Sequence, residues 1–294
     1  MRVMIAGWQG QVARAIAERA PGRSDISACA LGRPALNICE VRTIERALSE
    51  NRPDVIVNTA GYTAVDEAEE NPERAFAFNR DGARLLAQVA AKREVPIIHL
   101  STVNVFDGAK AAPYVEDDAP APLSVYGRSK LEGEAAVRAA NPRHIILRTS
   151  WVFSPFSDTF LPVLLAKARH AQQLRVVADQ TGSPTYAPDL AEAVLDVAAR
   201  VHGDKPNDTA PLWGTYHVAN AGGPSSWHEL AVEICRAARL PAGSHQVEKI
   251  FTHDYPTRAP RPRNAALDTT QIGKTLHISL RDWRAAVNDA VARL

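Results

Sequence analysis

Tyr126 and Lys130 stand four residues apart in the segment Tyr126-Gly127-Arg128-Ser129-Lys130, just ahead of a helix-forming run. Side chains at positions i and i+4 of a helix share a face. The pKa of a free phenol is about 10, and a cation beside it favours the phenolate and lowers that pKa. Such a pair could give a proton to a developing alkoxide near neutral pH. The same spacing also occurs in solvated surface pairs, so it needs supporting features.

A glycine-rich turn, Gly7-x-x-Gly10-x-x-Ala13, lies between an apolar strand pattern and a helical pattern at the start of the chain. In that context it predicts a nucleotide pyrophosphate at the helix N-terminus, where N–H groups lack partners and the helix dipole is positive. Gly7 would make the tight turn, Gly10 would let the backbone approach a phosphate, and Ala13 would allow helix–strand packing. A plain tight turn is the alternative.

The segment after the second expected strand bears on the choice of nicotinamide cofactor. An acidic side chain there would bind the ribose 2′-hydroxyl of NADH, but the sequence reads Leu31-Gly32-Arg33-Pro34. The guanidinium of Arg33 could instead pair with a 2′-phosphate. The sequence therefore favours NADPH, and NADH stays an alternative in which Arg33 is a solvent-facing loop residue.

Strand and helix patterns alternate through the first half of the chain. Apolar strands are expected at 2–6, 26–31, 55–58, 96–100 and 144–148, and helices at 11–20, 41–50, 75–93 and after residue 126. Continuous apolar strands indicate burial on both faces of a sheet. Their alternation with helices predicts an α/β fold, a Rossmann-type doubly wound parallel sheet.

In the second half of the chain, strand and helix patterns alternate less regularly, and prolines are frequent. Helices are still expected at 160–170, 189–201, 227–240 and 281–294. We interpret this half as a smaller mixed α/β substrate lobe over the sheet edge, with one or two strands that rejoin the sheet. The expected division is an NAD(P)-binding Rossmann domain over 1–150 and a substrate-binding lobe over 151–294, with a soft boundary.

Composition limits the partners and the compartment. The 294 residues contain 34 Lys plus Arg and 33 Asp plus Glu, which gives no electrostatic reason to expect nucleic acid or an anionic membrane. No apolar stretch reaches the roughly 18 residues of a membrane span. Three scattered cysteines suit neither a disulfide framework nor a zinc site, and no cluster has metal-ligand spacing. We expect a cytoplasmic protein without a metal; a homodimer is compatible with the sequence.

The turn and the Tyr126–Lys130 pair together resemble the short-chain dehydrogenase/reductase superfamily, in its extended nucleotide-sugar branch. Other segments add to the likeness: residues 58–69, Ser101-Thr102, 105–108, 148–153, 179–185, 189–191, 216–217, 226–227 and 261–264. In this order the series resembles the dTDP-4-dehydrorhamnose reductases, and the likeness extends over nearly the whole chain.

This resemblance implies a set of cofactor-binding residues. They are Gly7, Gly10, Gln11, Val12, Arg33, Asn37, Ile38, Gly61, Tyr62, Thr63, Tyr126 and Lys130. Residues 10–12 match the turn at the cofactor phosphates, 37–38 fall beside the adenine, and 61–63 match a loop under the nicotinamide side. Asn37 stands where the family has an aspartate, which weakens that assignment.

The resemblance also implies the reaction. It is the reduction of the C4 ketone of dTDP-4-dehydro-6-deoxy-L-mannose (dTDP-4-dehydrorhamnose) to dTDP-L-rhamnose, for surface polysaccharides. Tyr126 matches the proton donor, and Lys130 matches the residue that binds the nicotinamide ribose and depresses the tyrosine pKa. The hydroxyl of Thr102 matches a third catalytic group, which can hydrogen-bond the sugar ketone.

Two further residues are candidates for contact with the dTDP-sugar. Trp151 matches an aromatic residue that packs on the sugar, and a core tryptophan is the competing interpretation. Arg261 belongs to a proline-spaced set with Arg258 and Arg263. It could bind the substrate pyrophosphate through two hydrogen bonds, and a solvated surface role is its alternative.

The chain departs from the family pattern at Val103-Asn104, where Asp-Tyr is usual. This departure puts the fine specificity in question. It also argues against the nucleotide-sugar 4,6-dehydratases, which need an Asp-Glu pair there to eliminate water. Another nucleotide-sugar reductase or an epimerase remains an alternative. So does a non-catalytic NADP-binding regulatory subunit, like that of some methionine adenosyltransferases.

Overall fold

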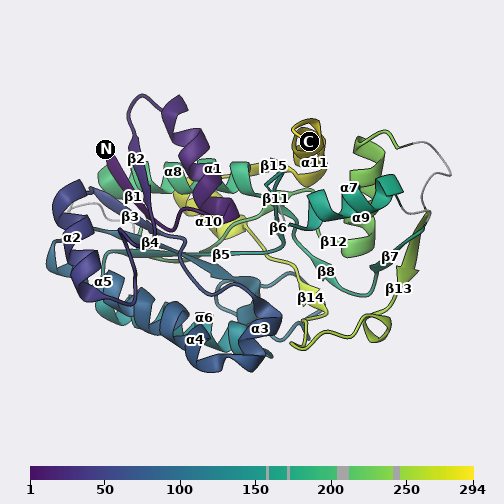
Figure 1. Cartoon of the computed structure of the whole chain (residues 1–294), viewed down its shortest axis with the longest axis horizontal. Coiled ribbons are helices and arrows are strands. Elements are labelled where there is room, and N and C mark those ends of the chain that lie inside the picture. Colours follow the sequence, from purple (N-terminus) through teal and green to yellow (C-terminus); the bar gives the residue numbers. More distant parts are fainter. Residues whose placement is uncertain (157–158, 171–172, 204–211, 241–245) are drawn as a thin grey trace.

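A six-stranded parallel sheet forms the centre of the computed structural model (Figure 1), which describes residues 1–156, 159–170, 173–203, 212–240 and 246–294. The strand order is β10-β5-β4-β3-β1-β2, and every pairing is parallel. The bounds are β1 Arg2–Ala6, β2 Ser27–Leu31, β3 Val55–Asn58, β4 Ile97–Thr102, β5 His144–Thr149 and β10 Gly214–His217. The expected Rossmann-type sheet is confirmed, with the strand order reversing between β1 and β3.

Helices cover both faces of this sheet, as its continuous apolar strands predicted. On one face α1 (Gln11–Arg19) packs against α8 (Ala187–Gly203), and the side chains of Val3 and Ile5 point into this layer. On the other face lie α2 (Val41–Asn51), α5 (Ala83–Lys92) and α6 (Val125–Ala140), and Met4 points toward them. The two layers lie above and below the sheet in Figure 1.

The segment expected as one helix over 75–93 is interrupted. It contains α4 (Pro72–Phe76), the π-helical turn η2 (Ala77–Gly82) and then α5. In η2 the Asn79 side chain accepts from the Tyr62 N–H at 2.8 Å and donates to Ser129 Oγ at 2.9 Å. Gly133 of α6 lies so close that any Cβ there would collide with the Asn79 carbonyl. The turn therefore fixes α6 beside α3 (Val65–Glu70) and the end of β3.

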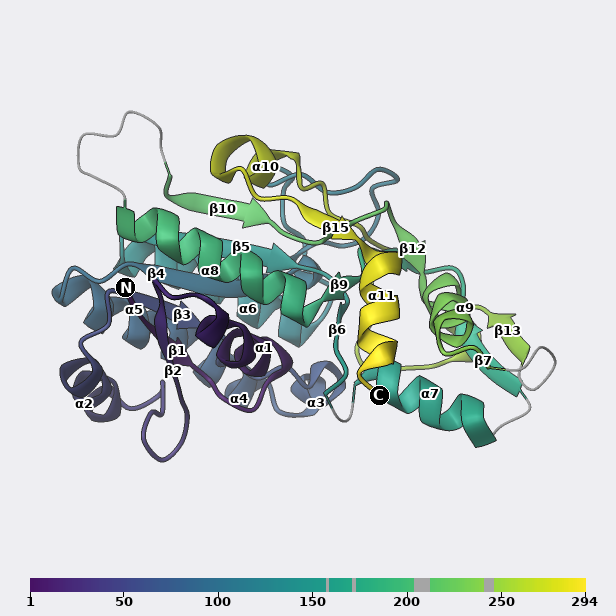
Figure 2. The same cartoon turned by 90° about the horizontal axis from the view of Figure 1, so that it is seen from above.

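A second core lies beyond the sheet's carboxyl edge, where Figure 2 shows α7, α9 and α11 beside the Rossmann part. These helices are α7 Phe160–His170, α9 Trp227–Ala237 and α11 Trp283–Ala292. They pack on one another and on the parallel pair β7 (Gln173–Val177) and β13 (Gln246–Ile250). Trp283, which is 1% exposed, lies at the centre of this core.

Short strands join the two parts. The pairs are β6 (Val152–Phe153) with β9 (Thr185–Tyr186), and β11 (Asn220–Ala221) with β15 (Leu280–Asp282). In addition, β8 (Thr181–Gly182) lies between β12 (Ser225–Ser226) and β14 (Asn264–Ala265). The helix α10 (Thr270–Leu276) packs near β10.

The second half also contributes to the first. The strand β10 pairs with β5 and α8 covers the sheet, so the expectation that a later strand rejoins the sheet is confirmed. The helix expected over 227–240 ends at Ala237. The helix expected from residue 281 begins at Trp283, because Arg281 is in β15 and Asp282 caps the helix by accepting the Arg284 N–H. The division at residue 150 stays a prediction.

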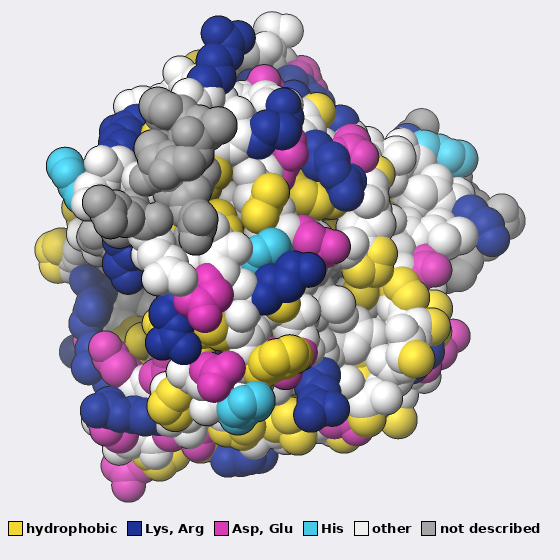
Figure 3. Space-filling view, turned by 90° about the vertical axis from the view of Figure 1, so that its right-hand side faces the viewer, with side chains coloured by type: hydrophobic (Ala, Val, Ile, Leu, Met, Phe, Trp, Pro, Cys, Tyr) yellow, Lys and Arg dark blue, Asp and Glu magenta, His cyan; other side chains and the backbone are white. Residues whose placement is uncertain are grey.

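Charges of both signs are interspersed over the face shown in Figure 3, in agreement with the nearly equal numbers of acidic and basic residues in the chain. All three cysteines are free; Cys235 is buried, and Cys29 and Cys39 are half-buried. In the described part of the chain, no helix has the length and apolar character that crossing a membrane requires.

Candidate active site

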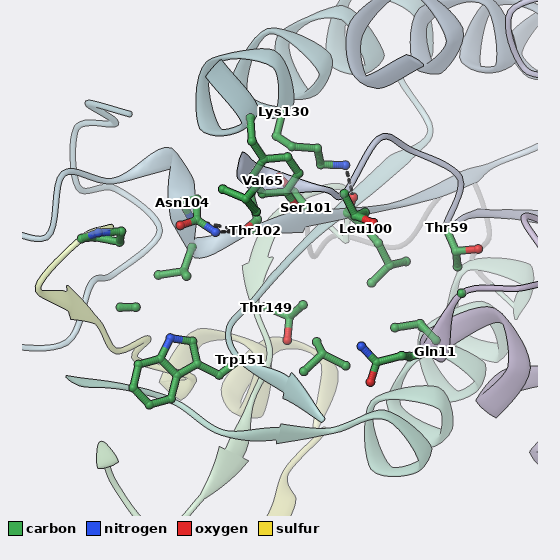
Figure 4. Close-up of a pocket in the computed structure, with 18 of the residues that line it drawn as sticks. Gln11, Thr59, Val65, Leu100, Ser101, Thr102, Asn104, Lys130, Thr149 and Trp151 are labelled. Atoms are coloured by element: carbon green, nitrogen blue, oxygen red, sulfur yellow. Dashed lines mark hydrogen bonds between the residues drawn. The ribbon is translucent and has the colours of Figure 1, made fainter. Parts of the chain in front are cut away.

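A cavity of about 450 Å³ opens at the carboxyl ends of the sheet strands, where parallel α/β sheets bind ligands. One wall is formed by the turn before α1 and by the ends of β4 and β5. Helix α6 also lines the cavity, and the second lobe contributes Trp151, Gln180, Trp227 and Arg261. Figure 4 shows Gln11, Thr102, Lys130, Thr149 and Trp151 around this space, each from a different element or connecting segment.

The glycine turn leaves the N-terminus of α1 open. Gly7 has a φ of +112°, and a Cβ there would collide with Thr59 Oγ1, so only glycine suits the position. Gly10 is the N-cap residue, no side chain caps the helix, and a Cβ at Gly10 would meet nothing within 4 Å. Gln11 and Val12 continue into the cavity wall. Uncapped N–H groups beside open space fit a phosphate.

The start of α6 presents Tyr126 and Lys130 to this cavity. Ser124 caps the helix by accepting the Gly127 N–H at 3.0 Å, and Glu69 of α3 accepts the Val125 N–H at 2.8 Å. Tyr126 and Lys130 are 8% and 5% exposed, and both line the cavity. The i, i+4 spacing therefore places both groups on the helix face that the sequence predicted.

Burial raises the pKa of Tyr126 above its ordinary value, and a hydrogen bond from Thr102 opposes this effect. The expectation that Lys130 lowers the pKa of Tyr126 is therefore wrong for this structure. The Lys130 amine instead donates to the Leu100 carbonyl oxygen at 2.6 Å, as Figure 4 shows. A phenol with a raised pKa keeps its proton at neutral pH.

Burial also lowers the pKa of Lys130 to about 8, against a smaller opposing effect of Glu134. His99 Nε2 lies 3.4 Å from the Lys130 Nζ. Because Asn58 Oδ1 accepts the Ala60 N–H at 3.1 Å, its Nδ2 donates to His99 Nδ1 at 3.0 Å. The His99 proton is then on Nε2, toward Lys130. An N–H facing the amine favours its neutral form.

Thr102 ends β4 at the centre of the cavity and is 6% exposed. Its Oγ1 accepts the backbone N–H of Asn104 at 3.2 Å and the Asn104 side-chain amide at 3.0 Å. The hydroxyl is therefore fixed in place next to Tyr126. Thr102, Tyr126 and Lys130, which the sequence grouped by resemblance, lie together in one site.

Trp151 reaches the cavity from the segment after β5. Its backbone has a positive φ of 42°, and its ring stacks on Trp227 with the ring centroids 3.8 Å apart. The other side of the ring lies on Gly182, where a Cβ would collide with it. The ring is half-buried and lines the cavity, so it can both stabilise the lobe and contact a ligand.

Arg261 lies where this cavity meets a second one of about 730 Å³ in the lobe. The two cavities share Arg261, Gln180 and Trp227. The Arg261 guanidinium pairs with Asp66 of α3 at 2.6 Å, whereas Arg258 pairs with Glu70 farther out. Arg261 is the member of the arginine set that reaches both cavities.

The residues predicted from the sequence divide into two groups. Those that line the first cavity are Gly10, Gln11, Val12, Thr63, Thr102, Tyr126, Lys130, Trp151 and Arg261. Those that do not line it are Gly7, Arg33, Asn37, Ile38, Gly61 and Tyr62. The second group lies around the β1 and β3 ends and after β2.

The residues expected beside the adenine have local structural partners. Arg33 is exposed, with its guanidinium 5.8 Å from the centre of the Phe78 ring. Ile38 is 3% exposed and packs into the core under η2. The Asn37 side chain donates to Glu40 at 2.6 Å and accepts the Cys39 N–H at 3.2 Å. Of these three, Arg33 is the group that is free to meet a ligand from solvent.

Several cavity residues were missed by the sequence reasoning. Thr149 is 8% exposed, and its hydroxyl has no hydrogen-bond partner among the described residues, although it points into the cavity in Figure 4. The position of Thr149 at the end of β5 was a signal that could have found it. Gln180 and Trp227 lie in the segments 179–185 and 226–227, which carried the family likeness, but their places in the cavity depend on tertiary contacts between distant segments. Asn104 was treated only as a departure from a pattern.

A family model described as the RmlD substrate binding domain matches residues 1–294. The dTDP-4-dehydrorhamnose reductase of Sinorhizobium fredii is 42% identical over 292 residues, covering 99% of this chain and 97% of that protein. A Streptomyces antibioticus protein named probable dTDP-4,6-dihydroxy-2-methyloxan-3-one 4-ketoreductase is 36% identical over 292 residues, covering 99% and 94%. The crystal structure of the Bacillus anthracis dTDP-4-dehydrorhamnose reductase in complex with NADP has a TM-score of 0.90 at 28% identity, covering 100% and 99%.

Proposed function

The chain belongs to the RmlD substrate binding domain family, and we propose that it reduces the C4 ketone of dTDP-4-dehydro-6-deoxy-L-mannose to dTDP-L-rhamnose with NADPH. The enzyme is an NADPH-dependent oxidoreductase of this family. The observation that carries the proposal is the convergence of Thr102, Tyr126 and Lys130 in a cavity that begins at the open N-terminus of α1. We assign the product to surface polysaccharide synthesis.

The open end of α1 would hold the cofactor pyrophosphate on its N–H groups. Arg33, exposed after β2, would pair with the 2′-phosphate of NADPH. The buried Thr149 hydroxyl and the Lys130 amine are hydrogen-bonding groups available to the nicotinamide end. When bound, NADPH supplies the hydride that the ketone carbon accepts.

Tyr126 would give the phenolic proton to the ketone oxygen as the carbon is reduced. The phenol O–H bond breaks, the alcohol O–H bond forms, and a phenolate remains to be reprotonated from solvent. The raised pKa of Tyr126 keeps the proton in place beforehand. Hydrogen bonding from Thr102 stabilises the phenolate that forms.

The dTDP-sugar would span the two adjoining cavities. The edge of the Trp151 ring would contact the 6-deoxyhexose, because its faces lie on Trp227 and Gly182, and Arg261 would bind the pyrophosphate at the point where the cavities meet. The larger cavity in the lobe would then receive the nucleoside. Its volume of about 730 Å³ is within the usual range for a ligand of this size.

A second candidate is the reduction of a different dTDP-4-keto-sugar. The Streptomyces antibioticus relative, at 36% identity, is named for a ketoreductase of a dTDP-linked dihydroxy-2-methyloxanone. In this chain Val103-Asn104 changes the cavity wall next to Thr102, which is where a sugar substituent would be distinguished. The catalytic groups would be the same for both substrates.

The decisive experiment mixes the purified protein with NADPH and a panel of dTDP-4-keto-sugars, and follows NADPH absorbance and the product by NMR. We expect turnover with dTDP-4-dehydrorhamnose and formation of the rhamno product. Tyr126→Phe should lower kcat by a factor of about 10² to 10⁴, the usual contribution of a general acid, while the Kd for NADPH stays nearly unchanged. Tight NADPH binding without turnover of any sugar would instead indicate a regulatory subunit.

A further inference from the structure

Trp8 is an exposed tryptophan inside the glycine turn. It is 52% exposed and stands between Gly7, whose positive φ makes the turn, and Gly10, the N-cap residue of α1. Single exposed aromatic residues are common and by themselves need no explanation. This one belongs to the turn that would hold the cofactor pyrophosphate, so the adenosine joined to that pyrophosphate comes within its reach.

The Trp8 ring lies on the residue that follows β2. Strands β1 and β2 are parallel neighbours, and the Gly7 N–H donates to the Leu31 carbonyl oxygen at 2.8 Å. The glycine turn therefore begins beside Gly32. The Cδ1 and Nε1 atoms of the indole approach Gly32 so closely that a Cβ there would collide with both. The N–H edge of the ring is thus held next to Gly32 and its neighbour, the exposed Arg33.

The chemistry at this place differs from that of an NADH site. An acidic side chain after β2 would accept a hydrogen bond from the 2′-hydroxyl of the adenosine ribose. In this chain the indole of Trp8 covers Gly32, and an indole N–H is a donor with no capacity to accept. A phosphate is an anion whose oxygens accept. An indole N–H beside an exposed guanidinium therefore suits a 2′-phosphate better than a 2′-hydroxyl.

The adenosine part of NADPH matches this arrangement. Its ribose carries the pyrophosphate on the 5′ carbon and the third phosphate on the 2′ carbon, so both anionic groups are attached to one small ring. The open N-terminus of α1 would hold the first and Arg33 the second, with Trp8 between them. The residues expected beside the adenine leave this place to Trp8, since Ile38 is buried and Asn37 makes local hydrogen bonds.

We propose that Trp8 is a cofactor-specificity residue, whose ring forms a wall of the adenosine ribose site and whose N–H donates to the 2′-phosphate of NADPH alongside the Arg33 cation. This inference rests on the use of NADPH in the proposed function and is independent of which sugar is reduced. It can be measured by cofactor binding in the absence of any sugar.

The test measures the Kd of each variant for two pairs of ligands that differ only in the 2′-phosphate. The pairs are NADPH with NADH, and adenosine 2′,5′-bisphosphate with 5′-AMP. Trp8→Phe keeps an aromatic ring and removes the N–H, whereas Trp8→Ala removes both. Trp213→Phe is the matched control, because Trp213 precedes β10, which Figure 2 shows at the opposite edge of the sheet from β2.

We expect Trp8→Phe to raise the Kd for NADPH and for the bisphosphate by about tenfold, the scale of one hydrogen bond to a charged group. The Kd for NADH and for 5′-AMP should stay within about twofold of the wild-type value. Trp8→Ala should weaken the binding of all four ligands, because the wall is lost as well, and the loss should be larger for the two that carry the 2′-phosphate. Trp213→Phe should change none of them.

A spectroscopic measurement follows the Trp8 N–H directly. The chain has five tryptophans, so protein labelled with ¹⁵N at the indole gives five N–H signals, and the signal of Trp8 is the one missing from Trp8→Phe. Adenosine 2′,5′-bisphosphate should move the Trp8 proton signal downfield, and 5′-AMP should move it less. An indole that only stabilises the turn would not distinguish the two nucleotides.

Gly32 offers a way to displace the ring without changing the tryptophan. Gly32→Ala should push the indole out of its place and weaken NADPH binding as Trp8→Phe does. In a Trp8→Ala background the same substitution should have no further effect, because the ring that it displaces is absent. Gly22→Ala, just before β2, is the control, since a Cβ at Gly22 meets nothing within 4 Å.

The proposal is overturned if Trp8→Phe binds NADPH as tightly as wild type, or if it weakens NADPH and NADH equally. Failure of the reductase function would appear differently, as wild-type protein that turns over no keto-sugar but shows the expected differences in cofactor binding. Wild-type protein that binds neither NADPH nor NADH would overturn both.

Discussion

Arg261 and Asp66 are 195 residues apart in sequence, yet their side chains form an ion pair of 2.6 Å that joins the second lobe to α3 of the Rossmann part. The Ala259 N–H donates to the same carboxylate at 3.0 Å. Asp66 thus holds residues 259 and 261 of the second lobe against the edge of the cavity. The guanidinium keeps further N–H groups that can turn to an anion, since arginine has five donors.

Replacement of Arg261 tests whether this cation binds the substrate. Arg261→Ala should raise the KM for the dTDP-sugar by about tenfold or more, because a charge-assisted contact to a pyrophosphate is lost. The kcat should change less, since the contact is equal in the ground and transition states. Arg258→Ala is the matched control: its guanidinium is exposed and pairs with Glu70, so KM should stay within about twofold. Equal effects of the two variants in steady-state kinetics would contradict the assignment.

Gly182 offers a way to move Trp151 without changing the tryptophan. A Cβ at Gly182 would collide with the indole, which is also held from the other side by Trp227. Gly182→Ala should therefore displace the ring, raise the KM for the sugar and cost about 1–3 kcal/mol of stability through overpacking. Gly203→Ala is the control, because a Cβ there meets nothing within 4 Å. Kinetics and thermal melting of both variants check the prediction, and a wild-type KM in Gly182→Ala would show that Trp151 does not contact the sugar.

Local patterns were sufficient to predict most of the fold. The strand at 2–6, the glycine turn and the helix after it depend on residues adjacent in sequence, and the structure has them at nearly the predicted bounds. The same is true of the common helix face of Tyr126 and Lys130. The interruption at η2 could not be predicted, because it depends on Asn79 binding Tyr62 and Ser129, which are distant in sequence.

The parts of the site that depend on tertiary burial were the ones missed or reversed. A cation four residues from a tyrosine suggested a lowered pKa, but the depth of Tyr126 in the fold raises it. The stack of Trp227 on Trp151 brings together residues that are distant in sequence. His99 lies on a buried strand, where its alternation with apolar residues gave no indication that its ring faces Lys130.

Arg33 should decide the preference between the two cofactors. Its side chain is exposed after β2, and no carboxylate in the segment 31–34 would repel a 2′-phosphate. Arg33→Ala should lower kcat/KM with NADPH by about tenfold, the scale of one charge-assisted pair, and leave NADH little changed. Arg42→Ala, on the exposed side of α2, should alter neither cofactor. The measurement is kcat/KM with both cofactors in each variant. An unchanged ratio in Arg33→Ala would show that Arg33 is a bystander.

The buried amine of Lys130 should make the stability of the protein depend on alkaline pH. Its pKa is about 8 in the folded state, whereas a free lysine has a pKa of about 10.4. Between these values the unfolded chain binds more protons, so this group makes stability rise with pH there. The cost of burying the cation is present in full below pH 8 and disappears as the pH approaches 10.

Lys130→Met removes this pH-dependent contribution to the free energy of unfolding, and it should also weaken NADPH binding and slow turnover. Denaturant unfolding of both proteins from pH 7 to 10 should show wild type gaining stability relative to Lys130→Met. A constant difference across this range would mean that the amine keeps an ordinary pKa.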